Sequence, residues 1–181
     1  MVGFRKTRKE RKTLYAFGEG ETEKAFLRHL KILYSGNNIK ISVKDLSGGC
    51  PDDMIDKAVR IVLHGIYDEK FIVLDEERDK GIFISEEGKN KAKKYGLDII
   101  DLQPCVEGLF LLILGKEKDS ILVMQAEQCK KEFEDNYLDA LKKLNFTEYQ
   151  NILPKELLEE KRGDILELDR IINYMENIMV S

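Results

Sequence analysis

Two groups of acidic residues follow two apolar segments of this chain. Glu19 and Glu23 come directly after the stretch "LYAFG", and Asp75, Glu77 and Asp79 end or follow the stretch "FIVL". Carboxylates crowded together repel one another unless a cation lies among them or water surrounds them. Carboxylate oxygens suit Mg²⁺ or Mn²⁺, which keep coordination positions open for the phosphate oxygens of a substrate. We therefore predict a Mg²⁺ or Mn²⁺ site formed by these acids.

A further acid, Glu107, stands within the apolar segment "PCVEGLFLLIL". If its side chain is buried, it needs a partner, which is a metal ion, an arginine or the N-terminus of a helix. We include Glu107 among the candidate metal ligands. Cys105 lies two residues earlier and has no histidine near it in the sequence. This favours a packed thiol over a nucleophile.

Each acid also has a purely structural interpretation. Glu19 would cap the first helix, and Glu23 would interact with the dipole of that helix. Asp75 would end its strand in a solvated turn. Glu77 and Asp79 belong to the charged run "DEERDK", which is typical of a solvated loop. The catalytic interpretation of Glu19, Asp75 and Glu77 therefore depends on their carboxylates converging in space.

The two glycines beside the first acids do not form a nucleotide-binding loop. The third glycine of a dinucleotide-binding fingerprint that begins at Gly18 and Gly20 would fall at Glu23. The chain also has no GxxxxGK phosphate-binding loop. The acids at this turn would repel a phosphate unless a cation bridged them.

The elements that must position these acids alternate between strand and helix. Apolar runs and period-two alternation predict strands at 14–17, 39–43, 71–75 and 97–102. Helical spacing and end signals predict helices at 22–35, 51–67 and 85–95. Ile66 is expected on the apolar face of the second of these helices. Mostly helical structure is expected beyond Leu114, with a break near Pro154.

Four strand and helix units in series predict an α/β fold. We expect a four-stranded parallel sheet flanked by helices, with a helical C-terminal extension. Ligands of such sheets collect beyond the carboxyl ends of the strands, and the predicted acids fall at that edge.

Length and composition favour a single domain with appendages. At 181 residues and 43% apolar residues, the chain can bury one sizeable core. We divide it into a basic arm (1–12), a core (13–116) and a C-terminal extension (117–181) of the same domain. No membrane span or secretory signal is expected, so we predict a cytoplasmic protein without a membrane partner. The three cysteines and two histidines are too scattered for a zinc knot or a disulfide framework.

The net charge of −4 conceals a basic segment before an acidic body. This segment holds six cations against Glu10 alone: Arg5, Lys6, Arg8, Lys9, Arg11 and Lys12. Such a segment can neutralise phosphates and release their counterions, so nucleic acid is a natural partner. A solubilising terminus without a binding role is the alternative.

Three motifs together resemble a known family. "FGEGETEKAFL" followed by "VLDEERD" resembles the TOPRIM signature, a glutamate after the first strand and Asp-x-Asp after the third. That signature is shared by topoisomerases, bacterial primases and OLD-type nucleases. "LQPCVEGLFLLIL" is similar to a segment of the RloB-like branch of TOPRIM proteins, which also tend to open with basic residues. The resemblance covers approximately residues 5–115. The sequence departs from it at Glu77, where the family has aspartate.

The resemblance implies a metal-dependent nuclease of bacterial phage defence, acting by abortive infection. Asp75 and Glu77 would hold one or two Mg²⁺ ions, and Glu19 would ligate a metal or act as general base. The substrate would be DNA or RNA, and a partner defence protein is a further candidate partner. A catalytically inactive TOPRIM-like module that binds nucleic acid or protein is the main alternative. A plain interaction protein whose acids lie only on the surface is the third.

Overall fold

The computed structural model describes residues 11–76, 80–138 and 146–176, and the side chains of 146 and 147 are excluded from description. The strands are β1 (Lys12–Gly18), β2 (Ile39–Asp45), β3 (Glu69–Asp75) and β4 (Asp98–Leu102). The first three helices are α1 (Glu21–Tyr34), α2 (Pro51–Leu63) and α3 (Glu86–Lys94). The remaining described helices are α4 (Val106–Ile113), α5 (Lys118–Leu122), α6 (Ala126–Tyr137), α7 (Phe146–Ile152), α8 (Lys155–Arg162) and α9 (Leu166–Glu176).

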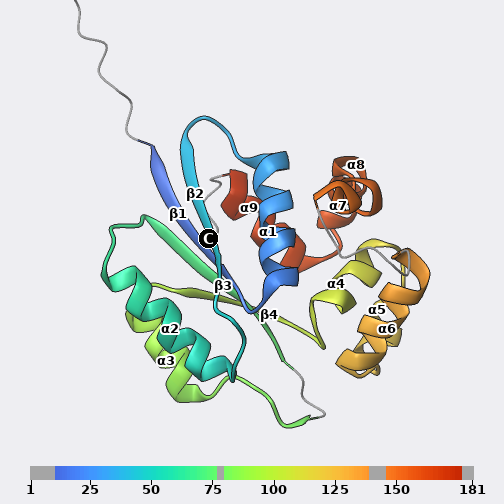
Figure 1. The fold of residues 1–181 in the computed structure, drawn as a ribbon, viewed down its shortest axis with the longest axis horizontal. Helices are drawn as coiled ribbons and strands as arrows, with labels where there is room; N and C mark the ends of the chain where they lie inside the picture. The colour runs from blue at the N-terminus through green and yellow to red at the C-terminus, as the bar shows by residue number, and fades with distance from the viewer. Residues whose placement is uncertain (1–10, 77–79, 139–145, 177–181) are drawn as a thin grey trace, which may run out of the picture.

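The four strands form one parallel sheet in the order β2-β1-β3-β4 (Figure 1). All four predicted strands are present, and the predicted α/β class with flanking helices is confirmed. The layout is consistent with a TOPRIM-like arrangement. Strands β1 and β3 are neighbours in the centre of the sheet, although α1, β2 and α2 separate them in the sequence. Glu19, after β1, and Asp75, at the end of β3, are thereby brought to the same edge.

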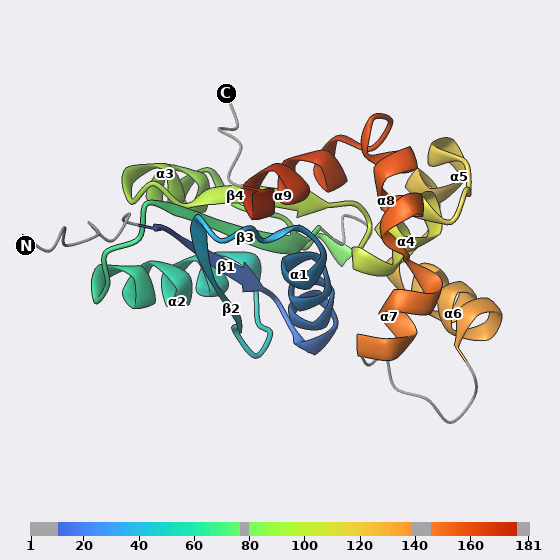
Figure 2. The same cartoon turned by 90° about the horizontal axis from the view of Figure 1, so that it is seen from above.

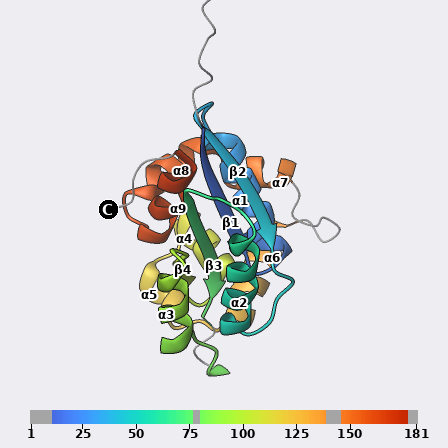
Figure 3. The ribbon, with the colours of Figure 1, turned by 90° about the vertical axis from the view of Figure 1, so that its left-hand side faces the viewer.

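Helices cover both faces of the sheet (Figure 3). Helices α2 and α3 pack on one face, over the apolar cluster that includes Phe17, Ile72 and Leu74. Helices α1 and α9 pack on the other face, where Leu14, Phe71 and their neighbours belong to a second cluster. Because both faces are covered, the central strands are apolar almost throughout, as the "FIVL" run of β3 indicated.

Helices α4 to α8 gather beyond the carboxyl ends of the strands (Figure 2). Their contact with α1 is largely aromatic. The ring of Phe110 on α4 lies 5.0 Å from that of Phe26 and 5.2 Å from that of Phe133, between centroids. Tyr149 on α7 is fully buried beside them, and its hydroxyl donates a hydrogen bond to the carbonyl of Thr22 at 3.1 Å. The C-terminal helices therefore share one apolar cluster with the sheet and α1.

The second helix is shorter than its apolar pattern predicted. Helix α2 ends at Leu63, and Ile66, which we expected on its buried face, is 95% exposed. Gly65 follows the C-cap residue His64, at the position where glycine commonly ends a helix, and a Cβ atom there would lie 2.4 Å from the ring of Tyr67. The chain leaves the helix at this close approach and enters β3. The prediction of a helix to 67 was therefore wrong at its C-terminal end.

No helix in the described part of the chain is both long and apolar enough to cross a membrane.

The aromatic contact between α4 and α1 should carry a large share of the stability. Replacing Phe110 by alanine is expected to lower the free energy of unfolding by about 3–5 kcal/mol, because the fully buried ring contacts Phe26, Phe133 and Tyr149. Urea unfolding measures the loss. Ile66→Ala is the control, since its exposed side chain should change the value by less than about 0.5 kcal/mol. A Phe110→Ala loss below about 1 kcal/mol would show that α4 does not anchor the C-terminal helices.

Candidate metal centre

The candidate site lies where β1, β3 and β4 end. Asp75 is the last residue of β3, and Glu19 stands in the turn between β1 and α1. Cys105 and Glu107 come after β4, at the start of α4. Because β3 pairs with both β1 and β4, these three segments leave the sheet side by side. Sheet topology therefore gathers residues that are more than 80 positions apart in the sequence.

A close approach of backbone at Gly18 positions the first two acids. A Cβ atom at Gly18 would lie 2.7 Å from Cβ of Glu23 and 2.9 Å from the amide nitrogen of Lys24. Only glycine leaves room for the first turn of α1 at this point. The carboxylate of Glu23 then accepts a hydrogen bond from the amide of Gly20 at 2.7 Å. The carboxylate of Glu19 turns toward β3 and accepts one from the amide of Asp75 at 3.4 Å.

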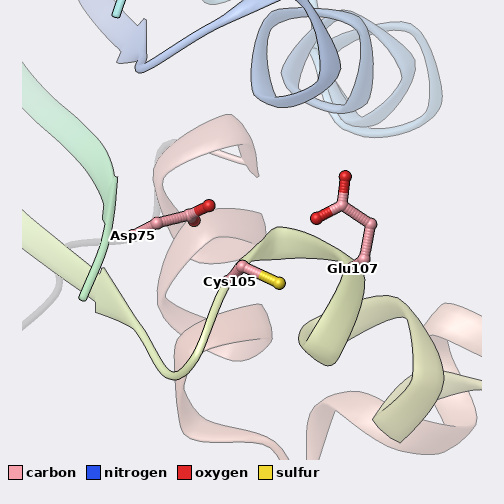
Figure 4. A group of neighbouring side chains, drawn as sticks. All are labelled: Asp75, Cys105 and Glu107. Carbon is pink, nitrogen blue, oxygen red and sulfur yellow. The ribbon is translucent and has the colours of Figure 1, made fainter. Parts of the chain in front are cut away.

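Asp75, Cys105 and Glu107 form a compact group of metal-ligand types. One carboxylate oxygen of each acid and Sγ of the cysteine all lie within 4.8 Å of one another. Figure 4 shows the carboxyl groups of Asp75 and Glu107 pointing toward one another, with the Cys105 side chain between them. Both acids are nearly inaccessible, with 7% and 8% of their surfaces exposed. Among the described residues, neither Oδ1 of Asp75 nor Oε2 of Glu107 has a hydrogen-bond partner.

The electrostatics of the group are unfavourable in the absence of a cation. Burial raises the pKa of Asp75 well above its ordinary value, and the charges of Glu23, Glu19 and Glu107 raise it further. Burial is also the main cause that raises the pKa of Glu107. A divalent cation would supply the missing charge and occupy the unpartnered oxygens. The residues present therefore fit a metal ion.

The thiol of Cys105 is buried and remains protonated in the metal-free protein. A hydrogen bond with Cys129 raises its pKa most, followed by burial and by the negative charges of the two neighbouring acids. The thiol also lies 3.7 Å from the carbonyl of Ala126, to which it donates. These contacts agree with the packed thiol that the sequence favoured, and they make a poor nucleophile because the reactive thiolate is disfavoured.

The structure brings together four of the acids predicted as metal ligands. Asp75 and Glu107 are in the compact group, and Glu19 and Glu23 lie close enough to raise the pKa of Asp75. Glu23 also accepts a hydrogen bond from the amide of Gly20 at the N-terminus of α1. This contact agrees with its structural interpretation as a partner of the helix dipole. Glu77 and Asp79 lie outside the described residues, so their predicted roles as ligands stay predictions.

The basic arm is described only at its end. Arg5, Lys6, Arg8 and Lys9 lie outside the described residues, whereas Arg11 and Lys12 are exposed. Lys12 begins β1, and the candidate metal centre lies beyond the other end of that strand. Seven residues of strand span about 20 Å. Arg11 and Lys12 therefore cannot touch a group bound at the metal centre.

Two charged residues near the site were not singled out from the sequence. Lys130, half-buried on α6, lowers the pKa values of both Asp75 and Glu107 through its positive charge. Nothing in its local sequence distinguishes it from the other lysines of the extension. Glu76 is buried and accepts hydrogen bonds from the amide of Ile84 and the side chain of Gln103. It follows Asp75 directly, but these hydrogen bonds connect it to Ile84 and Gln103 rather than to the acid group.

Comparisons of this chain with protein-family models, with curated proteins and with solved structures gave no match.

The raised pKa of Asp75 predicts how stability depends on pH. In the native state Asp75 holds its proton to a higher pH than in the unfolded chain, where its pKa is near 3.8. Metal-free protein should therefore lose stability as pH rises from about 4 to the native pKa, by about 1.4 kcal/mol for each pH unit in that interval. Urea unfolding at several pH values in the presence of a chelator measures this slope.

Asp75→Asn should flatten the slope and stabilise the metal-free protein at neutral pH. Asp101→Asn is the matched control, because Asp101 also lies near the end of a strand but belongs to no such acid group among the described residues. An Asp75→Asn variant with the wild-type slope would show that Asp75 is not held in an unfavourable environment.

Proposed function

We propose that this chain is a TOPRIM-type, metal-dependent phosphodiester hydrolase that acts on nucleic acid. The observation that carries the proposal is the pair of buried carboxylate oxygens on Asp75 and Glu107, unpartnered within the described residues, at the ligand edge of a parallel sheet. Burying such a pair without a cation is unfavourable, because each acid must either stay charged at a cost of several kcal/mol or keep its proton. The order of the motifs, which resembles that of the RloB-like proteins, supplies the reaction class.

Each acidic side chain of the site would have its own role in the reaction. Asp75 and Glu107 would hold Mg²⁺ or Mn²⁺, with Glu19 and Glu23 close by. When bound, the ion polarises the scissile phosphate and stabilises the charge on the leaving oxygen. Glu19 would add a ligand or accept the proton of the attacking water, as the resemblance implies. Glu77 would extend the set of ligands from the segment after β3.

Lys130 would contribute the positive charge that the acids lack. Its charge acts on both Asp75 and Glu107, which supports a role for it beside a phosphate held at this site. An ammonium group acts there as a point charge and stabilises negative charge that develops on phosphate oxygens. We assign Lys130 to phosphate binding in the reaction.

The basic arm would bind a different part of the nucleic acid. Arg11 and Lys12 lie at the start of β1, and the metal centre lies beyond the other end of this strand. Their contacts with nucleic acid would therefore lie about 20 Å from the cleaved bond. Such contacts position the backbone without reading sequence. A role in phage defence, a cytoplasmic location and a partner defence protein follow from the family resemblance alone.

One observation favours a second candidate, a catalytically inactive module that binds nucleic acid. Glu77 replaces the aspartate of the family signature, and its side chain is longer by one methylene group. Mg²⁺ requires near-ideal octahedral geometry, so a displaced ligand can abolish turnover while binding persists. Glu77→Asp distinguishes the two candidates. It should keep or raise cleavage by a nuclease, whereas neither wild type nor variant of an inactive module would cleave.

Removal of a metal ligand should abolish activity on a mixed pool of single-stranded and structured DNA and RNA. Asp75→Asn and Glu107→Gln are each expected to lower the cleavage rate with Mn²⁺ by more than about 100-fold. Loss of an outer-shell partner alone costs about 10- to 100-fold, and these residues would bind the ion directly. Gel assays of purified protein measure the rates, and Asp101→Asn should retain wild-type activity. Equal cleavage by wild type and Asp75→Asn would place the activity in a contaminant or at another site.

Lys130 should affect cleavage without being needed for the metal ion. Lys130→Ala is expected to lower the rate by about 100- to 1,000-fold, the cost of removing one preorganised electrostatic partner of the transition state. The increase in melting temperature caused by Mn²⁺ should persist, because removing a cation does not weaken a cation site. Lys131→Ala, at the next and exposed position of α6, is the control. If both variants cleave like wild type, Lys130 does not contact the phosphate.

A further inference from the structure

The candidate metal centre contains a ligand that Mg²⁺ does not use. Sγ of Cys105 belongs to the same group of atoms, within 4.8 Å, as the carboxylate oxygens of Asp75 and Glu107. Magnesium binds oxygen ligands, whereas thiolates select softer ions such as Zn²⁺. A centre built for Mg²⁺ alone has no need of this thiol. The presence of Cys105 therefore bears on which ions the centre accepts.

We propose that Cys105 makes this centre a zinc site, in which Zn²⁺ is bound by Sγ of Cys105 and by the carboxylates of Asp75 and Glu107. Zinc and magnesium would then compete, since both need the two carboxylates but only zinc needs the thiol. The proposal builds on the metal centre of the proposed function and does not require that the protein cleave nucleic acid.

The geometry of the group suits a zinc ion after small movements. Bond lengths of about 2.3 Å to sulfur and 2.0 Å to oxygen place the ligand atoms of a tetrahedral site about 3.5 Å apart. The present separations of up to 4.8 Å need side-chain shifts of about 1 Å. Three protein ligands leave a fourth position open, which is the pattern of catalytic rather than structural zinc sites.

The unpartnered oxygens provide an independent indication of a cation at this point. Oδ1 of Asp75 and Oε2 of Glu107 are buried without a hydrogen-bond partner in the described part of the chain. Binding would form bonds from zinc to Sγ of Cys105 and to the carboxylates of Asp75 and Glu107. It would break the S–H bond of Cys105 and any O–H bond that the two acids hold, and these protons would pass to solvent. The negative charges of Asp75 and Glu107 disfavour the thiolate of Cys105 in the metal-free protein. The two positive charges of the ion would offset them.

The other two cysteines provide controls. Cys129 is buried beside Cys105 but does not belong to the group of ligand atoms. Cys50 is exposed at the start of α2 and would bind soft metals non-specifically. All variants for this test should therefore carry Cys50→Ser.

Cobalt titration followed by absorption tests the proposal directly. Co²⁺ substitutes for Zn²⁺ and gives a near-ultraviolet sulfur-to-cobalt charge-transfer band when a thiolate binds it. The full-length Cys50→Ser protein should show this band at one equivalent. Cys105→Ser should lose it and bind Co²⁺ at least about 10-fold more weakly. Cys129→Ser should retain the band, and Asp75→Asn should weaken Co²⁺ binding by a similar factor.

Two further measurements keep the test decisive if Cys105→Ser folds poorly. In the Cys50→Ser protein, one equivalent of Zn²⁺ should bleach the cobalt band, and excess Mg²⁺ should decrease it by competing for the carboxylates. In a folded Cys105→Ser protein, stabilisation by Mg²⁺ in a thermal melt should persist. A missing band, or a band that survives in Cys105→Ser, would overturn the zinc site. A band without nuclease activity would contradict only the proposed function, and Mg²⁺-dependent cleavage without a band would contradict only the zinc site.

Discussion

The burial of mutually repelling carboxylates at the end of β3 is the constraint on which the site depends. Asp75 is held in a nearly inaccessible position by the strand that it ends, and three other acids raise its pKa. The positive charge of Lys130 offsets this only in part. The acid group destabilises the native state, and packing in the remainder of the chain must offset this loss. A bound cation would stabilise the native state by neutralising the acids.

Stabilising contacts lie on both sides of the acid group. The pairing of β1 with β3 reaches Phe17 and Ile72, and the end of β3 pairs with β4 as far as Asp75 and Leu102. The close approach at Gly18 sets α1 against the end of β1. On the far side, Phe110 and Tyr149 bind the C-terminal helices to α1. The helical extension, for which the sequence offered no role, therefore packs beside the site and carries Lys130, whose charge acts on Asp75.

The fold was largely predictable because its strands are short, apolar and separated by helices with clear end signals. The strand order was not predicted, since nothing in the local sequence states that β3 pairs with β1 rather than β2. The acids after β1 and β3 could be assigned to one edge because parallel strands share it, and Glu19 and Glu23 lie close enough to Asp75 to raise its pKa. Glu107, which joins Asp75 in the compact group, was a candidate for a different reason, that a buried acid needs a partner. Lys130 and the participation of Cys105 depend on packing between helices distant in sequence, and no spacing reveals such contacts. The false extension of α2 to Ile66 arose from an apolar pattern that continues past the helix, where Gly65 and Tyr67 decide the end.

Anomalous scattering from crystals soaked in Mn²⁺ tests the central claim most directly. The account predicts a manganese peak within bonding distance of Oδ1 of Asp75 and Oε2 of Glu107, and its absence from crystals of Asp75→Asn. A manganese peak elsewhere with none at this position would contradict it. So would a map in which a protein hydrogen-bond donor already occupies both oxygens.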